Sequence, residues 1–247
     1  MKTERCEIRN AYSIRIKRYE PDGEPAGYVL ALHGFCGDME SSFIRKLGKV
    51  MTEHELSVVA FNFPGHGSSD ADSYFSLENC RRDMLDVMKY SNRRYGVSAP
   101  YAVVGTSFGG YVALLDSGDI PDTTKIVLRA PAVNMKRSFE SFVSDMKSFR
   151  RNGWEEMGFE RKIAVPFSFY SELEKYSVLE HCFDREMLIV HGDSDTVVLP
   201  EEMKTFGKNN PLAELRVIVG ADHRFKGEGQ LKCVFDIIDE YMFSRGE

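Results

Sequence analysis

The residue types best suited to chemistry in this chain gather around Ser107, in the segment 101–110. The segment begins as an apolar, β-forming run, passes through Gly105-Thr106-Ser107-Phe108-Gly109, and continues as a helix-like run. The G-x-S-x-G pattern is typical of a sharp strand-to-helix turn that exposes a serine hydroxyl. Its glycines suit such a turn because a Cβ atom there would crowd the neighbouring backbone. We therefore interpret Ser107 as a nucleophile, with an ordinary glycine-rich turn as the alternative.

A serine hydroxyl is a weak nucleophile by itself and needs a base within hydrogen-bond reach. Where the serine stands at such a turn, its partners follow in the chain order Ser, Asp or Glu, His. Of the histidines that follow Ser107, only His223 also comes after a plausible acid, as this order requires, so it is the candidate base. The acid is expected after the predicted strand 187–191, where Asp193 and Asp195 compete. We favour Asp195, which can fold back towards the strand ends, while Asp193 is better placed to cap the turn.

Backbone N–H groups are the expected donors to the oxyanion that forms during attack on a carbonyl carbon. One comes from the residue after the nucleophile and the other from a loop after an earlier strand. The predicted strand 28–33 ends in such a loop, so we assign the donors to Phe35 and Phe108. His33 precedes the serine and is expected to brace its loop by hydrogen bonding. The same structural role is expected for His66, in a turn-rich loop after another apolar strand.

With these pieces in order, the chain resembles the α/β-hydrolase superfamily over nearly its whole length. The nearer likeness is to small serine esterases that include bacterial cinnamoyl and feruloyl esterases. It rests on HGFCGD at 33–38, FPGHGSSD at 63–70, GTSFGG at 105–110, HGDSDTVV at 191–198 and GADHRF at 220–225. The chain departs from these relatives at Thr106, where they usually carry histidine.

The resemblance implies an α/β-hydrolase fold, a mostly parallel twisted sheet with helices on both faces. It also implies a carboxylic ester hydrolase that acts through an acyl-enzyme on small or aromatic esters, including hydroxycinnamoyl esters, with no metal or organic cofactor. Ser107, Asp195 and His223 would form its triad. The same triad would serve a peptidase, a thioesterase or a monoacylglycerol lipase, and a relative that only binds ligands is a further alternative. An aspartate nucleophile, as in epoxide hydrolases and dehalogenases, is excluded by Ser107.

Length and composition favour one compact catalytic domain over residues 1–247, with 43% apolar residues. A formal charge of −6 without a Lys/Arg block argues against nucleic acid as a partner. The partner that the resemblance implies is a small-molecule ester. No apolar run approaches the ~20 residues that span a bilayer, and no apolar region follows the N-terminus as in a signal peptide. The five scattered cysteines suit reduced thiols. We expect a cytoplasmic protein, as a monomer or a homodimer.

Strands and helices alternate along the chain, which is typical of a parallel sheet covered on both faces. The expected strands are 6–10 and 12–19, which form a hairpin, and then 28–33, 57–63, 101–106, 125–130, 187–191 and 214–219. The expected helices are 40–54, 76–95, 108–117, 200–207 and 230–244.

This alternation breaks between about 132 and 180, a stretch too long and too apolar for a plain loop. Large apolar side chains recur there at helical spacing, at Phe139, Phe142, Met146 and Phe149. They predict a small helical cap over the strand ends, where it would roof a substrate pocket. The candidates for contact with substrate are Trp154, Phe139, Phe142 and Phe169. Packing of the cap against the core is the alternative role for each of them.

Overall fold

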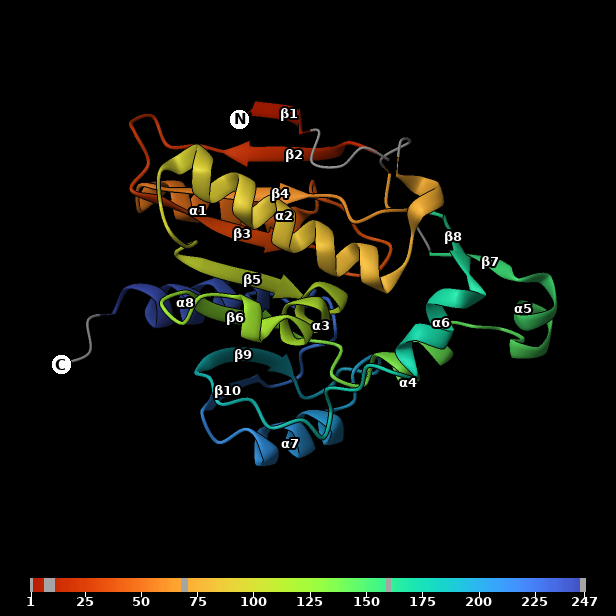
Figure 1. Cartoon of the computed structure of the whole chain (residues 1–247). Coiled ribbons are helices and arrows are strands. Elements are labelled where there is room, and N and C mark those ends of the chain that lie inside the picture. The colour runs from red at the N-terminus through yellow and green to blue at the C-terminus, as the bar shows by residue number, and fades with distance from the viewer. Residues whose placement is uncertain (1, 7–11, 68–70, 159–160, 245–247) are drawn as a thin grey trace.

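A central eight-stranded sheet organises the chain, and the computed structural model describes residues 2–6, 12–67, 71–158 and 161–244 (Figure 1). The order along the sheet is β1-β2-β4-β3-β5-β6-β9-β10. These strands are β1 (Lys2–Cys6), β2 (Ile14–Tyr19), β3 (Gly27–Leu32), β4 (Leu56–Phe61), β5 (Ala102–Thr106), β6 (Lys125–Arg129), β9 (Met187–Gly192) and β10 (Ala213–Ile218). β2 pairs antiparallel with β1 and β4, and the other neighbours are parallel. The mostly parallel sheet is therefore confirmed.

The chain opens with an antiparallel pair, whose first strand lies nearer the N-terminus than expected. β1 ends at Cys6, while the strand expected over 6–10 falls outside the described residues for its last four positions. The other expected strands, and the five expected helices, agree with the structure to within about two residues at each end.

Helices cover both faces of the sheet and enclose two hydrophobic cores. The helices outside the 132–180 segment are α1 (Ser42–Glu53), α2 (Leu77–Tyr95), α3 (Phe108–Leu115), α7 (Pro200–Asn209) and α8 (Gln230–Phe243), with short 3₁₀ helices η1 (Asp72–Tyr74) and η2 (Ser117–Asp119). One core lies under α1 and α8, where Phe43 stacks on Phe235, and the other under α2, α3 and α7. Side chains alternate between the two along each strand, so Val29 enters the first core and Leu30 the second.

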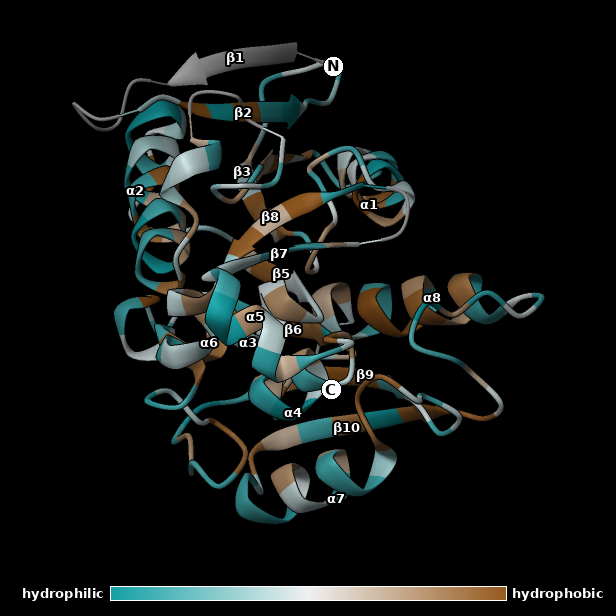
Figure 2. Ribbon diagram, turned by 90° about the vertical axis from the view of Figure 1, so that its right-hand side faces the viewer, coloured by the Kyte–Doolittle hydropathy of each residue, from teal (hydrophilic) through white to brown (hydrophobic). Residues whose placement is uncertain are grey.

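Hydropathy follows this layering. In Figure 2 the hydrophobic residues gather in the central strands, while α2 presents a largely hydrophilic outer surface. α2 is amphipathic, with Cys80, Met84 and Val87 buried at helical spacing. None of the helices in the described part of the chain is both long and apolar enough to cross a bilayer.

The strand order brings the loops that carry the candidate residues to one edge of the sheet. β4 and β5 lie on opposite sides of β3, so the strand order reverses direction there, and on open α/β sheets ligands bind at the carboxyl ends of strands at such a point. β5, β9 and β10 run parallel, so the loops after them leave the same edge. Ser107, Asp195 and His223 follow these three strands.

The segment 132–180 lies beyond the carboxyl ends of the parallel strands (Figure 1). It contains α4 (Met135–Glu140), α5 (Met146–Asn152), β7 (Trp154–Met157), β8 (Ile163–Pro166) and α6 (Phe167–Leu173). The segment contains helices, as the sequence predicts, but it also contains the antiparallel pair β7 and β8, which the sequence analysis did not predict. Along β8 the side chains alternate between buried and exposed, with Ile163 and Val165 inward and Ala164 outward, a period that suits a strand.

The helical spacing read from Phe139 to Phe149 is also divided between two helices. α4 ends at Glu140, and α5 begins only at Met146, with Asp145 as its N-cap. The Asp145 carboxylate accepts a hydrogen bond from the Lys147 N–H and so satisfies a donor that has no partner within the helix. The N-cap Asp145 thus starts a new helix within the run of residues whose spacing predicted a single helix.

Candidate active site

Ser107 stands at the turn between β5 and α3 in a strained backbone conformation, with φ 51° and ψ −112°. Its N–H donates to the Arg129 carbonyl at 2.9 Å, which ties the turn to β6. Both flanking glycines are required by close backbone approach. A Cβ atom at Gly105 would lie 2.7 Å from the Gly110 Cα, and one at Gly109 would lie 2.5 Å from the Leu32 carbonyl oxygen.

A continuous row of hydrogen bonds joins Ser107, His223 and Asp195. The Ser107 hydroxyl lies 3.0 Å from His223 Nε2, and His223 Nδ1 lies 2.7 Å from Asp195 Oδ2. Since Asp195 is buried and ionised, the Nδ1 atom carries the proton and Nε2 is left free to accept one from the serine. The structure thus brings the three sequence candidates together in the geometry of a serine, histidine and aspartate triad.

Asp195 is held by its own loop as well as by His223. Its Oδ1 accepts from the N–H groups of Val197 and Val198 at 2.8 and 2.9 Å. Burial alone would raise the pKa of this carboxyl, but the hydrogen bonds from His223 and from the two backbone N–H groups outweigh burial and lower the pKa below its ordinary value. The acid therefore stays ionised beside the imidazole.

Asp193, the competing acid, lies elsewhere in the same turn. Its exposed carboxylate accepts from the Gly220 N–H at 2.6 Å and from the Ser194 hydroxyl at 3.1 Å. It therefore links the loop after β9 to the loop after β10, a turn-capping role. The structure brings Asp195, and not Asp193, to the imidazole.

The loop that carries His223 is ordered from two sides. Asp222 Oδ1 accepts from the N–H groups of Arg224 and Lys226 at 3.0 and 3.1 Å, which closes the loop into a tight turn. The Arg129 guanidinium donates to the Arg224 carbonyl at 2.8 Å. Burial between the rings of Phe43 and Phe225 lowers the pKa of Arg129 to about 10, so it remains a cation at neutral pH.

The two predicted oxyanion donors lie on the elements that the sequence indicates. Phe108 is the first residue of α3, where the N–H has no acceptor within the helix, and Phe35 lies in the turn closed by the Gly37 N–H and the Gly34 carbonyl. Among the described residues, no acceptor bonds the N–H of Phe35 or Phe108. The positive end of α3 adds favourable electrostatics for an anion beside Ser107.

Two buried histidines support this turn without reaching the serine. His33 Nδ1 donates to the Gly34 carbonyl at 2.8 Å, and its Nε2 accepts from the Phe63 N–H at 3.1 Å. His66 Nδ1 donates to the Pro64 carbonyl at 2.9 Å. Burial lowers the pKa of His33 to about 4 and that of His66 to about 3, so both are neutral. Both therefore have the bracing contacts expected from the sequence.

Aromatic rings surround Phe35, directly behind its candidate N–H donor. Its ring centroid lies 6.2 Å or less from those of Phe75, Phe108, Phe139 and Phe169. Two of the four candidate substrate contacts thus belong to this cluster. The other two, Trp154 and Phe142, are 56% and 40% exposed.

The connection between β7 and β8 reaches back to the turn that carries Phe35. Arg161 Nη2 donates to Asp38 Oδ2 at 2.6 Å, and Arg161 Nη1 donates to the His66 carbonyl at 3.2 Å. A Cβ atom at Gly67 would overlap the Arg161 guanidinium, so the contact requires glycine there. The 132–180 segment is therefore joined to the candidate oxyanion turn by an ion pair.

Cys36 lies in this turn with φ 57° and a half-buried side chain. Burial raises the pKa of its thiol to about 12, so the thiolate is not populated near neutral pH. The described residues contain no group of three or more His, Cys, Asp and Glu side chains arranged to hold a metal ion.

Sequence reasoning missed the arginines that organise the site. Arg129 and Arg161 are joined to residues about 95 positions away, and Arg137 to Glu202, 65 positions away. No local motif distinguishes them from solvated surface arginines. Only their partners in the fold separate them from the other cations of the chain.

A family model described as "Serine aminopeptidase, S33" matches residues 23–176. No curated protein sequence matches the chain significantly.

Solved structures match over nearly the whole chain. Alpha/beta hydrolase domain-containing protein 10 from mouse superposes with a TM-score of 0.79 at 17% identity, covering 98% of each chain. Est1E from Butyrivibrio proteoclasticus gives 0.78 at 19% identity, also covering 98% of each. A structure of Est1E with ferulic acid bound gives 0.75 at 21% identity, covering 93% of this chain and 94% of that one. At these identities the likeness shows a shared fold.

Proposed function

Since the chain belongs to the S33 serine aminopeptidase family of α/β-hydrolases, we propose that it is a serine hydrolase that cleaves carboxylic esters through an acyl-enzyme. The row of hydrogen bonds from Ser107 through His223 to Asp195 carries this proposal. Ser107 is the nucleophile, His223 the base and Asp195 the orienting acid. The backbone N–H groups of Phe35 and Phe108 receive the oxyanion.

In the first step the Ser107 oxygen attacks the ester carbonyl while its proton passes to His223 Nε2. Asp195 holds the imidazole by Nδ1 and stabilises the imidazolium that forms. Negative charge develops on the carbonyl oxygen, where the two N–H groups stabilise it. The tetrahedral intermediate then collapses, and His223 returns the proton to the departing alcohol.

In the second step a water molecule attacks the acyl-enzyme, again with His223 as base, and the carboxylic acid leaves. The strained Ser107 backbone supports this chemistry, because the turn holds the hydroxyl clear of its neighbours before substrate arrives. Arg129 and Asp222 serve the same end by ordering the loop that carries the base.

For the acyl group we propose small or aromatic acids, including hydroxycinnamates. The rings of Phe139 and Phe169 lie beside Phe35 and are fully buried, so they would line an apolar, aromatic acyl site under the 132–180 segment once side chains of this cluster move to admit the substrate. The fold shared with Est1E, which has been solved with ferulic acid, supports the same class. Trp154 and Phe142 are too exposed to be its main lining.

Peptide hydrolysis is a second candidate, because the matching family model is that of a serine aminopeptidase. An aminopeptidase must bind the α-ammonium group of its substrate, which a nearby carboxylate would do best. Asp38 is the carboxylate beside the candidate oxyanion turn, and it is already paired with Arg161. The pairing favours the ester over the peptide.

The two candidates are separated by hydrolysis rates on p-nitrophenyl esters, methyl hydroxycinnamates, acyl-CoA thioesters and aminoacyl anilides. We expect the highest kcat/KM on esters, and loss of turnover by about 10³-fold or more in Ser107→Ala, since the three residues act as a unit. Circular dichroism of the variant controls for folding. Faster hydrolysis of anilides would favour the peptidase, and undiminished turnover in Ser107→Ala would remove Ser107 as nucleophile.

A further inference from the structure

The peptide between Val197 and Val198 is hydrogen bonded on both sides. Its N–H, from Val198, donates to Asp195 Oδ1 at 2.9 Å. Its carbonyl, from Val197, accepts from Arg137 Nη2 at 2.7 Å and from the Ser138 hydroxyl at 3.1 Å. Both donors belong to α4, the first helix of the 132–180 segment. One peptide plane therefore connects this segment to Asp195.

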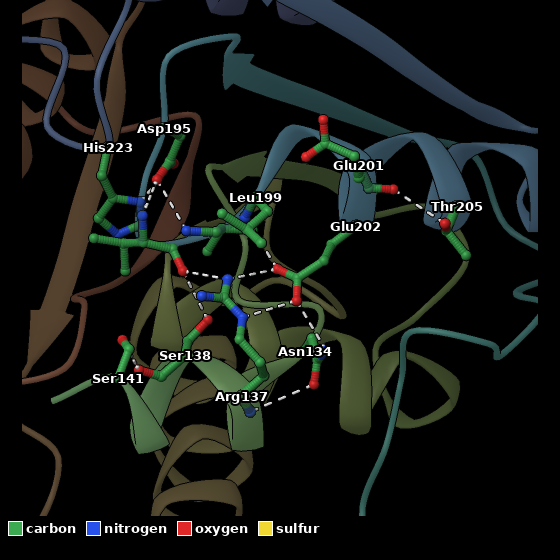
Figure 3. A network of polar contacts seen from close by, with 12 residues as sticks. Asn134, Arg137, Ser138, Ser141, Asp195, Leu199, Glu201, Glu202, Thr205 and His223 are labelled. Carbon is green, nitrogen blue, oxygen red and sulfur yellow. Dashed lines mark hydrogen bonds and ion pairs between the residues drawn. The ribbon is translucent and has the colours of Figure 1, made fainter. Parts of the chain in front are cut away.

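Glu202, on α7, holds the Arg137 side chain in place (Figure 3). The guanidinium donates from Nε to Oε1 at 3.0 Å and from Nη2 to Oε2 at 2.8 Å, the two-pronged geometry of a strong ion pair. The carboxylate also accepts from Asn134 Nδ2 at 2.8 Å and from the Leu199 N–H at 3.0 Å. Glu202 is only 9% exposed, so water competes little for its oxygens. The guanidinium is thereby fixed against the Val197 carbonyl.

We propose that Arg137 is a positioning residue for Asp195, an inference that rests on the proposed hydrolase activity. A cation that donates to a carbonyl polarises the peptide and strengthens its N–H as a donor, so the Val198 N–H binds Asp195 Oδ1 more firmly. With Oδ1 held, Oδ2 stays directed at His223 Nδ1, at 2.7 Å. Arg137 touches neither the serine nor the imidazole and acts through the Val197–Val198 peptide.

A purely structural role for the same contacts has different consequences. If the Arg137–Glu202 pair only joined α4 to α7, its loss would lower stability and leave the reactivity of Ser107 in the folded protein unchanged. A positioning role requires that the reactivity of Ser107 and the hydrogen bond between His223 and Asp195 change together.

The variants must avoid an unpaired buried charge, because removal of Arg137 alone would strand the Glu202 carboxylate. The test variant is therefore Arg137→Met combined with Glu202→Gln. Glu202→Gln alone is an intermediate variant, since it keeps Arg137 but weakens the ion pair that fixes the guanidinium against the Val197 carbonyl. Arg151→Met is the matched control on the same segment, because Arg151 is exposed and bonds only the Ser148 hydroxyl among the described residues.

Two readouts need no knowledge of the substrate. The first is the second-order rate constant for labelling of Ser107 by a fluorophosphonate, with the site located by mass spectrometry. The second is the low-field proton NMR resonance of the His223 Nδ1–H. We expect the double variant to be labelled roughly 10²-fold more slowly, the cost of a slightly misplaced catalytic group. Its Nδ1–H resonance should move upfield. Glu202→Gln should lie between the double variant and the wild type in both readouts, and the control Arg151→Met should stay near the wild type.

A folded double variant that is labelled at the wild-type rate, with an unmoved resonance, would overturn the proposal. If the double variant does not fold, Arg137→Lys replaces it, because an ammonium keeps the charge but cannot serve Glu202 and the Val197 carbonyl with the same fork. Wild-type labelling by Arg137→Lys would equally overturn the proposal. Absence of Ser107 labelling in the wild type would instead refute the proposed function, and the NMR resonance alone would then decide the role of Arg137.

Discussion

Acid should destabilise this protein through His66, a histidine that the fold buries in its neutral form. His66 is fully buried against Phe35, Phe75 and Phe108. Its Nδ1 donates to the Pro64 carbonyl, and its Nε2 has no partner among the described residues. Protonation of Nε2 would therefore place a charged N–H in an aromatic environment without an acceptor, and burial lowers the pKa of His66 to about 3.

The magnitude follows from proton linkage. In the unfolded chain a histidine binds its proton near pH ~6.5, whereas the folded chain does not bind it until about pH 3. The stability from this site is therefore complete above pH ~6.5 and is lost as pH falls, at about 1.4 kcal/mol per pH unit. Between pH 7 and pH 5 the free energy of unfolding should lose about 2 kcal/mol from His66 alone.

The assay is urea unfolding, followed by circular dichroism, of the wild type and of His66→Phe at the two pH values. The variant loses the hydrogen bond to Pro64 and should be about 1 kcal/mol less stable at pH 7. Between pH 7 and pH 5, however, its stability should fall about 2 kcal/mol less than that of the wild type, because phenylalanine does not titrate. His33, with a pKa lowered to about 4, remains in both proteins and cancels in the comparison.

His181→Gln, which replaces an exposed histidine, is the matched control for the loss of one histidine from the chain. Equal losses between pH 7 and pH 5 in the wild type and in His66→Phe would refute the reasoning. Such a result would mean that the folded protein binds the proton on His66 as readily as the unfolded chain does.

Asp195→Asn should lower kcat by about 10⁴-fold, because an amide no longer orients the imidazole, while Asp193→Asn should lower kcat far less. Steady-state kinetics of ester hydrolysis measure both effects, and the reverse ranking would make Asp193 the acid. The ion pair between Arg161 and Asp38, whose side chains are 35% and 25% exposed, should show a coupling of about 0.5–1 kcal/mol in a double-mutant cycle with Arg161→Gln and Asp38→Asn, measured by urea unfolding. A coupling of zero would mean that solvent screens the contact fully. Phe169→Leu should lower the ratio of kcat/KM for a methyl hydroxycinnamate to that for p-nitrophenyl acetate roughly fivefold, since an aromatic pair contributes about 1 kcal/mol beyond its buried area. An unchanged ratio in the folded variant would assign Phe169 to packing alone.

The sequence alone was sufficient to predict the core of the fold and to select Ser107, Asp195 and His223 as candidates, because strands and the turn at Ser107 depend on short-range patterns. The apolar run before Gly105 predicts a strand, and the glycines predict the tight turn that the backbone approaches to Gly110 and Leu32 require. The order of Ser107, Asp195 and His223 follows from the topology of a parallel sheet, whose loops meet at one edge. The spacing of apolar residues and the positions of glycines are local features of the sequence, so they can be recognised without the structure.

Only the tertiary structure decided how the inserted segment is built and which charged residues serve the site. β7 and β8 form strands because their residues pair with each other and alternate residues of β8 are buried. The helical spacing of the neighbouring phenylalanines does not predict this pairing. Arg137 and Glu202 are 65 positions apart, and each resembles an ordinary surface charge in its own helix. Whether a charge is solvated or buried against a partner depends on elements distant in the chain, and so does the hydrogen-bond path from Arg137 to Asp195.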